Sequence, residues 1–108
     1  MSASPNKFRN VPTVLDGHRF PSKAEANRYA YLKLLARAGE IRDLKLQPKY
    51  ALKVNGEFIG NYIGDFEYVE TNTNTAVLED VKGVATPIFK WKAKHLKAQY
   101  GIDVRIVK

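Results

Sequence analysis

The 108-residue chain is long enough for one domain with a modest hydrophobic core. It contains no cysteine, which excludes disulfides and cysteine-ligated zinc, and His18 and His95 are too few for a multi-histidine metal site. No apolar run approaches the ~20 residues that span a bilayer, so we expect a cytoplasmic protein. The 18 basic and 11 acidic residues give a net charge of +7, which favours a polyanionic partner but also serves solubility.

The first twenty residues contain an arm and a turn. Residues 1–12 are small, polar and basic, which predicts a flexible N-terminal arm ahead of a single domain over residues 13–108. Asp16-Gly17 is a preferred two-residue turn, so we expect a short hairpin from Thr13 to Phe20.

A first helix is predicted from Ser22 to Ala38. Ser22 is a suitable N-cap, and Glu25 three residues later completes a capping box. Apolar residues including Tyr29 and Leu32 recur at helical spacing. Glu25 lies four residues before Tyr29, so we expect its side chain to point inward on the same face of the helix.

Extended chain follows the first helix. The run from Ile41 to Val54 is interrupted by Pro48, which indicates an edge or a bulge. Asn55-Gly56 then predicts a hairpin turn. The stretch from 61 to 83 contains two β-prone runs around a Thr-Asn-Thr-Asn turn, which is a second hairpin.

A second helix is predicted from Thr86 to Tyr100, followed by a final strand over residues 102–107. Thr86 is a candidate N-cap and Pro87 a favourable first helical residue. The expected buried stripe consists of Phe89, Ala93, Leu96 and Tyr100. The order of helix, three or more strands, helix and strand predicts an α/β fold with a central mixed sheet flanked by two helices.

Two carboxylates are expected to face each other in the second hairpin. If its turn is centred between Asn72 and Thr73, Asp65 falls opposite Asp80, and Lys82 points to the same face as Asp80. Like charges directly opposite in a sheet are destabilising, and a divalent cation between them would remove that cost. Hard oxygen ligands of this kind suit Mg²⁺ or Mn²⁺.

Asp65 followed by Asp80-Val81-Lys82 on the next strand resembles the signature of the PD-(D/E)XK nuclease superfamily, with Gly64 in place of a loosely kept proline. The wider chain resembles small phage-encoded nuclease-like proteins through GHRFPSKAEA, LQPKY, the EDVKG segment and the basic helix after it. This resemblance implies a restriction-endonuclease-like αβββαβ core.

The resemblance also implies a division of roles. Asp65 and Asp80 would hold Mg²⁺ or Mn²⁺, with the carbonyl of Val81 as a further ligand. Lys82 would orient water or offset charge in the transition state. In related resolvases and transposon-end endonucleases a glutamate of the first helix reaches the same metal, which suggests Glu25. Its place in a capping box is an alternative explanation.

Other polar residues are expected to border this site or to have structural roles. Gln47 is a possible neighbour from an adjacent strand. Glu79 is expected on the opposite face of its strand, paired with a lysine, and Glu67 lies further from Lys82. His18 and His95 are expected at the surface rather than acting as bases.

The second helix carries a basic face. Lys90, Lys94 and Lys97 recur at helical spacing with Lys92 beside them, and no acidic residue lies between Val84 and Gly101. We therefore expect no neutralising pairs and a contact to DNA phosphates. Trp91 could stack on a base, or it could pack in the core.

Together these features predict a metal-dependent endodeoxyribonuclease that leaves 5′-phosphate and 3′-hydroxyl ends, as the resemblance implies. The expected substrate is branched or junction DNA in phage recombination, replication or packaging, cut by a homodimer in the host cytoplasm. One alternative is a nucleic-acid-binding protein without catalysis. Another is an interaction subunit of a larger phage enzyme.

Overall fold

The computed structural model describes residues 11–108, so the predicted arm over residues 1–12 lies almost entirely outside the described residues. The predicted hairpins and both predicted helices are confirmed. The helices and strands are β1 (Thr13–Leu15), β2 (His18–Phe20), α1 (Lys23–Arg37), β3 (Ile41–Leu46), β4 (Lys49–Val54), β5 (Glu57–Ile63), β6 (Phe66–Glu70), β7 (Thr75–Val81), α2 (Pro87–Tyr100) and β8 (Val104–Val107).

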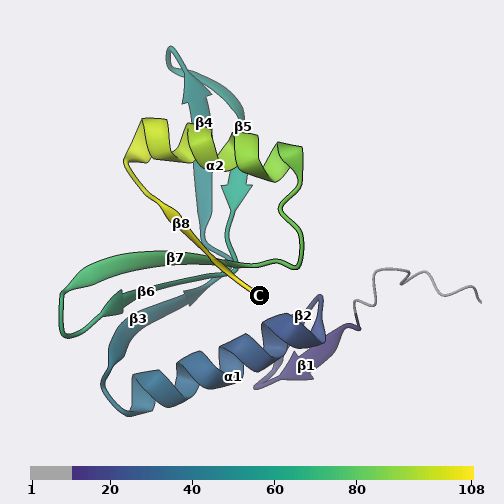
Figure 1. Ribbon diagram of the computed structural model, residues 1–108, viewed down its shortest axis with the longest axis vertical. Helices are drawn as coiled ribbons and strands as arrows, with labels where there is room; N and C mark the ends of the chain where they lie inside the picture. The colour runs from purple at the N-terminus through teal and green to yellow at the C-terminus, as the bar shows by residue number, and fades with distance from the viewer. Residues whose placement is uncertain (1–10) are drawn as a thin grey trace, which may run out of the picture.

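The central sheet has four strands in the order β3-β6-β7-β8. The β3–β6 and β6–β7 pairs are antiparallel, whereas β7 and β8 are parallel, so the sheet is mixed as predicted. The two helices lie on opposite sides of this sheet (Figure 1). Counting only the helices and the strands of the sheet, the chain order from α1 onward is helix, three strands, helix, strand.

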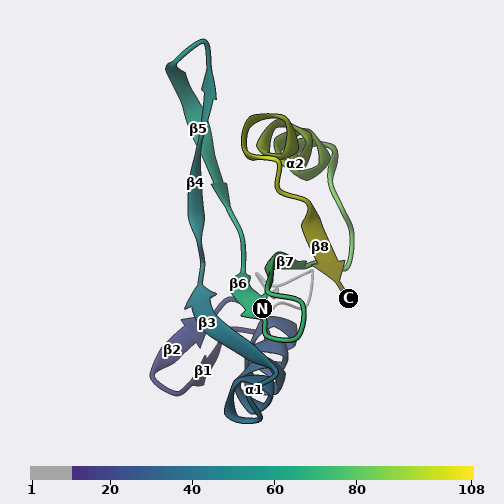
Figure 2. The same ribbon diagram turned by 90° about the vertical axis from the view of Figure 1, so that its left-hand side faces the viewer.

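The β4–β5 hairpin is inserted between the first two strands of the sheet and forms a separate two-stranded ribbon. It extends away from the sheet as a long arm beside α2 (Figure 2). Asn55 and Gly56 make its turn with φ values of 51° and 82°. These positive φ values explain the Asn-Gly pair, which adopts the left-handed region at little cost.

The register of β6 and β7 matches the prediction. Phe66 pairs with Glu79 and Glu70 pairs with Thr75, which centres the turn between Asn72 and Thr73. Asp65 immediately precedes β6 rather than lying within it. Its N–H donates to the carbonyl of Glu79 at 2.9 Å, so Asp65 still lies against the end of β7.

Helix α1 begins and ends where the sequence indicates. The hydroxyl of Ser22 accepts a hydrogen bond from the N–H of Glu25 at 3.1 Å, and Gly39 follows the helix with a φ of 77°. Its inward stripe packs against the sheet and against the β1–β2 hairpin. This core cluster contains Phe20, Ala26, Tyr29, Leu32, Ile41, Phe66, Tyr68 and Val77.

Helix α2 packs on a second core cluster formed by Leu52, Tyr62, Leu78 and Leu96. It therefore rests on the β4–β5 arm as well as on the sheet. The predicted stripe is wrong at Tyr100, whose side chain is exposed and whose hydroxyl donates to the carbonyl of Ala51 at 2.7 Å. A tyrosine at the helix end meets a backbone acceptor on the neighbouring arm, which a helical pattern does not reveal.

Within residues 11–108, no helix has both the length and the hydrophobicity needed to cross a membrane.

Candidate active site

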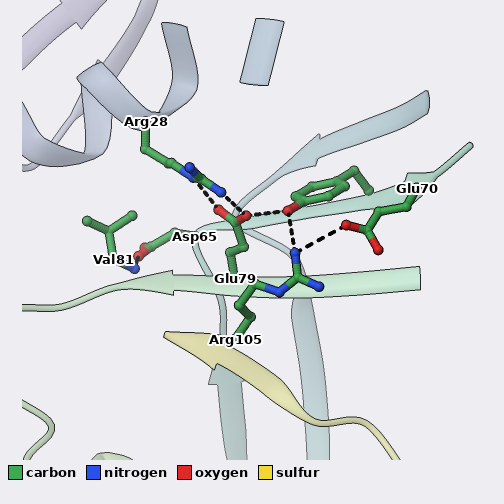
Figure 3. A network of polar contacts seen from close by, with 7 residues as sticks. Arg28, Asp65, Glu70, Glu79, Val81 and Arg105 are labelled. Atoms are coloured by element: carbon green, nitrogen blue, oxygen red, sulfur yellow. Dashed lines mark hydrogen bonds and ion pairs between the residues drawn. The ribbon is translucent and has the colours of Figure 1, made fainter. Parts of the chain in front are cut away.

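Three acidic side chains come from three separate elements. Asp65 lies in the bend between β5 and β6, Asp80 near the end of β7, and Glu25 in the first turn of α1. The backbone N–H of Val81 donates to Oδ2 of Asp65 at 2.7 Å, and Figure 3 shows this contact beside β7. The Asp65 carboxylate is therefore held against the strand that carries Asp80.

Gly64 explains how Asp65 comes so close to β7. A Cβ atom at this position would lie 2.7 Å from Cδ1 of the buried Leu78, so a larger residue would force the Leu78 side chain to move. The N–H of Gly64 donates to the carbonyl of Pro48 at 3.0 Å, a bond that a proline could not make. Glycine therefore lets Asp65 approach β7 without displacing Leu78.

The carboxyl group of Glu25 turns toward Asp65. Its side chain is buried, and burial raises its pKa from 4.5 to about 7, with further contributions from the charge of Asp65, a hydrogen bond between these two carboxyl groups and the charge of Asp80. Lys82 acts in the opposite direction. Among the hydrogen bonds of residues 11–108, none returns from the Ser22 N–H to the Glu25 carboxylate. Only half of the capping box is therefore formed.

Asp80, near the end of β7, and Lys82, directly after the strand, lie close together. The Lys82 ammonium is 3.6 Å from Oδ1 of Asp80, and it lies 4.4 Å from the centre of the Phe89 ring. The hydroxyl of Tyr62 donates to Oδ2 of Asp80. Burial raises the pKa of Asp80, and the charge of Lys82 opposes this rise. Sequence reasoning missed Tyr62, because its contact depends on how the β4–β5 arm leaves the sheet.

The pKa of Asp65 is also set by opposing effects of burial and of nearby positive groups. Burial raises the pKa of this carboxyl group, while the Val81 N–H and the charge of Lys82 lower it. Three partly desolvated carboxyl groups thus have one nearby ammonium group between them. Bringing like charges together in a desolvated site costs free energy, and a bound cation reduces that cost.

The donor types fit Mg²⁺ or Mn²⁺, which prefer carboxylate oxygens. In residues 11–108, however, no three acidic, histidine or cysteine side chains are arranged so that they could hold one metal ion. Both oxygens of Asp80 face other partners, namely Tyr62 and Lys82. The chemistry of the acids therefore suits a divalent cation, but their side-chain positions do not form a closed metal site.

Glu79 is on the opposite face of β7, as predicted, and its side chain is fully buried. The prediction of a lysine partner is wrong. Arg28 of α1 donates to both carboxylate oxygens of Glu79, at 2.9 and 2.6 Å, and the Tyr68 hydroxyl donates to the same group (Figure 3). An arginine suits this place because its planar fork binds a carboxylate through two parallel bonds.

This buried network extends to the sheet edge and fixes the position of α1. Arg105 of β8 lies 3.5 Å from the Tyr68 hydroxyl and 3.3 Å from the Glu70 carboxylate. Burial and then the bond to Glu79 raise the pKa of Tyr68 to about 12. Arg28 is three residues after Glu25 on α1, so its bond to β7 also fixes where Glu25 lies relative to Asp80.

The remaining candidates have other surroundings. Gln47 directly follows β3. Its backbone N–H donates to the Asp65 carbonyl at 2.9 Å, but its side chain is exposed.

Glu67 and the two histidines also have other surroundings. Glu67 accepts a hydrogen bond from Tyr50 and borders a hollow of about 460 Å³ that none of the three acids lines. His18 is exposed, whereas His95 is partly buried and bonds the Lys53 carbonyl at 2.9 Å.

The basic face of α2 is less uniform than predicted. Lys97 pairs with Asp103, just beyond the helix, at 2.5 Å, so the expectation of no neutralising pair is wrong there. Lys92 donates to the backbone carbonyl of Asn61 at 3.2 Å. Within the described part of the chain, Lys90 and Lys94 are exposed and form no ion pair. The helix contains no acidic residue, but the chain turns after Gly101 and brings Asp103 to Lys97.

Comparison with known proteins identifies one family. No curated protein matches it, and no solved structure matches it. One family model, described as "Protein of unknown function (DUF1064)", matches residues 5–107. Because this match spans nearly the whole chain, the protein belongs to the DUF1064 family.

Proposed function

We propose that this chain is a small metal-dependent endodeoxyribonuclease of the PD-(D/E)XK type. The observation that carries the proposal is that Glu25 and Asp65 lie next to the end of β7, where Asp80 forms an ion pair with Lys82. The order of helix, three strands, helix and strand supports a restriction-endonuclease-like core. The β4–β5 arm is then an insertion in that core.

Glu25, Asp65, Asp80 and the carbonyl of Val81 would hold Mg²⁺ or Mn²⁺. When bound, the cation would neutralise charge on the phosphodiester and lower the pKa of water. Asp80 would exchange its hydrogen bond from Tyr62 for this role. Lys82 supplies a positive charge beside the acids, where it can stabilise negative charge that develops on the phosphate oxygens.

The exposed lysines of α2 would contact the DNA backbone. Lys90 and Lys94 are the strongest candidates because neither forms an ion pair within the described residues. Such contacts give affinity without sequence preference. The products would carry 5′-phosphate and 3′-hydroxyl ends, and the substrate would be branched or junction DNA in a phage recombination, replication or packaging pathway. A homodimer would cut both strands.

A second candidate is a nucleic-acid-binding protein without catalysis. One observation favours it. Both oxygens of Asp80 have partners within the protein, Tyr62 and Lys82, so this carboxylate is satisfied without a metal. In that case the basic face of α2 would serve binding alone.

A cleavage panel separates the two candidates. Linear, nicked, flapped and four-way DNA would be incubated with the protein and Mg²⁺, Mn²⁺ or EDTA. The nuclease proposal predicts cation-dependent cleavage that Asp80→Asn abolishes and Glu67→Gln preserves, because the Glu67 carboxylate bonds Tyr50 instead. Binding of these DNAs without cleavage under any condition would favour the second candidate.

A further inference from the structure

Trp91, the only tryptophan of the chain, lies on the outer surface of α2. Its side chain is 67% exposed, so the alternative that it packs in the core is wrong. Tryptophan is enriched at interfaces, where a partner covers its large aromatic surface. The exposed indole is therefore available for contact with a partner.

The surroundings of Trp91 combine an apolar surface with positive charge. Trp91 borders a small hollow of about 90 Å³ between α2 and the β4–β5 arm. The other lining residues are Leu52, Ile59, Gly60, Lys92 and His95. Pockets that enclose small molecules measure roughly 300–1,000 Å³. The hollow is far too small for that purpose, so the indole and the arm present an open platform.

The charge around this platform distinguishes between possible partners. Lys90 precedes Trp91, Lys94 lies three residues after it on the same side of the helix, and both are exposed. No acidic residue occurs between Val84 and Gly101. Lysine is depleted in protein–protein interfaces, whereas single-stranded nucleic acids bind to aromatic rings that lie among basic side chains.

We propose that an unpaired base of single-stranded DNA stacks on Trp91 while the adjoining phosphates contact Lys90 and Lys94. This inference rests on the proposed function and narrows its substrate class to DNA that exposes unpaired bases, such as flaps or open junctions. Stacking needs only the face of a base, so we expect little preference among sequences. A fully paired duplex keeps its bases in the stack and cannot make this contact.

The test uses the full chain in EDTA, where no cleavage can occur. Fluorescence of the sole tryptophan is titrated with single-stranded oligo-thymidine and with a blunt duplex. Saturable quenching by the single strand but not by the duplex is expected. Trp91→Ala should weaken single-strand binding, measured with a labelled oligonucleotide, by roughly ten-fold or more. Trp91→Phe should retain most of the affinity, because phenylalanine can also stack.

Val14→Ala is the matched control, because Val14 is similarly exposed but lies on the β1–β2 hairpin on the other side of the sheet. Equal quenching by duplex and single strand, or unchanged affinity in Trp91→Ala, would overturn the inference. The proposed nuclease can fail separately: quenching by the single strand together with no cation-dependent cleavage would support the stacking site and reject the enzyme.

Discussion

The buried pair between Arg28 and Glu79 yields a sharp prediction about stability. Replacing Arg28 with methionine keeps much of the apolar stem but removes both hydrogen bonds to Glu79, at 2.9 and 2.6 Å. The Glu79 side chain is fully buried, so its carboxylate cannot recover those bonds from bulk water. Within residues 11–108, the Tyr68 hydroxyl would then be the one remaining hydrogen-bond donor to the Glu79 carboxylate.

The loss of unfolding free energy in Arg28→Met is set by the Glu79 carboxylate, which stays buried without its charged partner. Removing one partner of a buried ion pair typically costs about 3–5 kcal/mol, because the other charge stays buried. We expect the lower end, about 3 kcal/mol, because the Tyr68 hydroxyl still donates to Glu79 and Arg28 is itself partly exposed. Domains of this size are stable by roughly 5–15 kcal/mol, so the loss is a large share of the total.

Urea unfolding followed by circular dichroism measures this loss. Arg28→Met should lower the unfolding midpoint strongly, while Lys97→Met, which removes the exposed pair with Asp103, should cost at most about 1 kcal/mol. Glu79→Gln in the Arg28→Met background should restore part of the stability, because it removes the unpaired charge. A cost below about 1 kcal/mol for Arg28→Met would instead mean that water reaches the Glu79 carboxylate and replaces the lost hydrogen bonds.

Three further predictions concern the site and the basic helix. Asp80→Asn should abolish cleavage without weakening DNA affinity, measured by gel shift, because it removes an acid and its negative charge; cleavage at the wild-type rate would contradict its role. Replacing Lys90 and Lys94 with Gln should reduce the slope of log affinity against log salt by roughly 2, whereas Lys97→Gln should change it less because Lys97 is paired with Asp103. Without metal, the raised pKa of Glu25, about 7 against 4.5, contributes stability that is complete below pH 4.5 and is lost as the pH rises through 7. Glu25→Gln should therefore unfold at a higher temperature than the wild type at pH 8 in EDTA but not at pH 4, and equal melting at pH 8 would contradict this assignment.

Local signals in the sequence determine much of the fold. The hairpin register, which pairs Phe66 with Glu79 and so brings Asp65 next to the end of β7, follows from where the Thr-Asn-Thr-Asn turn is centred. Helix starts follow from Ser22 and Thr86, whose hydroxyls accept the N–H groups of residues three positions later. Each of these features depends on residues that are close together in the chain, which is why a pattern can reveal them.

The contacts that complete the site join residues far apart in the chain. Arg28 and Glu79 are 51 positions apart, and Tyr62 and Asp80 are 18 apart. The sequence does not show that the β4–β5 arm leaves the sheet, and this departure brings Tyr62 to Asp80. The exposure of Trp91 could not be predicted either, because helical spacing does not show how α2 is rotated over the arm.

We propose that Glu25, Asp65 and Asp80 act as one cation-dependent site for DNA cleavage. The most direct measurement is the single-turnover cleavage rate of Glu25→Gln against wild type over a range of Mg²⁺ concentrations, with Glu67→Gln as the control. We predict a fall of orders of magnitude for Glu25→Gln and a normal rate for the control. A Glu25→Gln protein that cuts at the wild-type rate at every Mg²⁺ concentration would show that Glu25 takes no part in cleavage and has only a structural role at the start of α1.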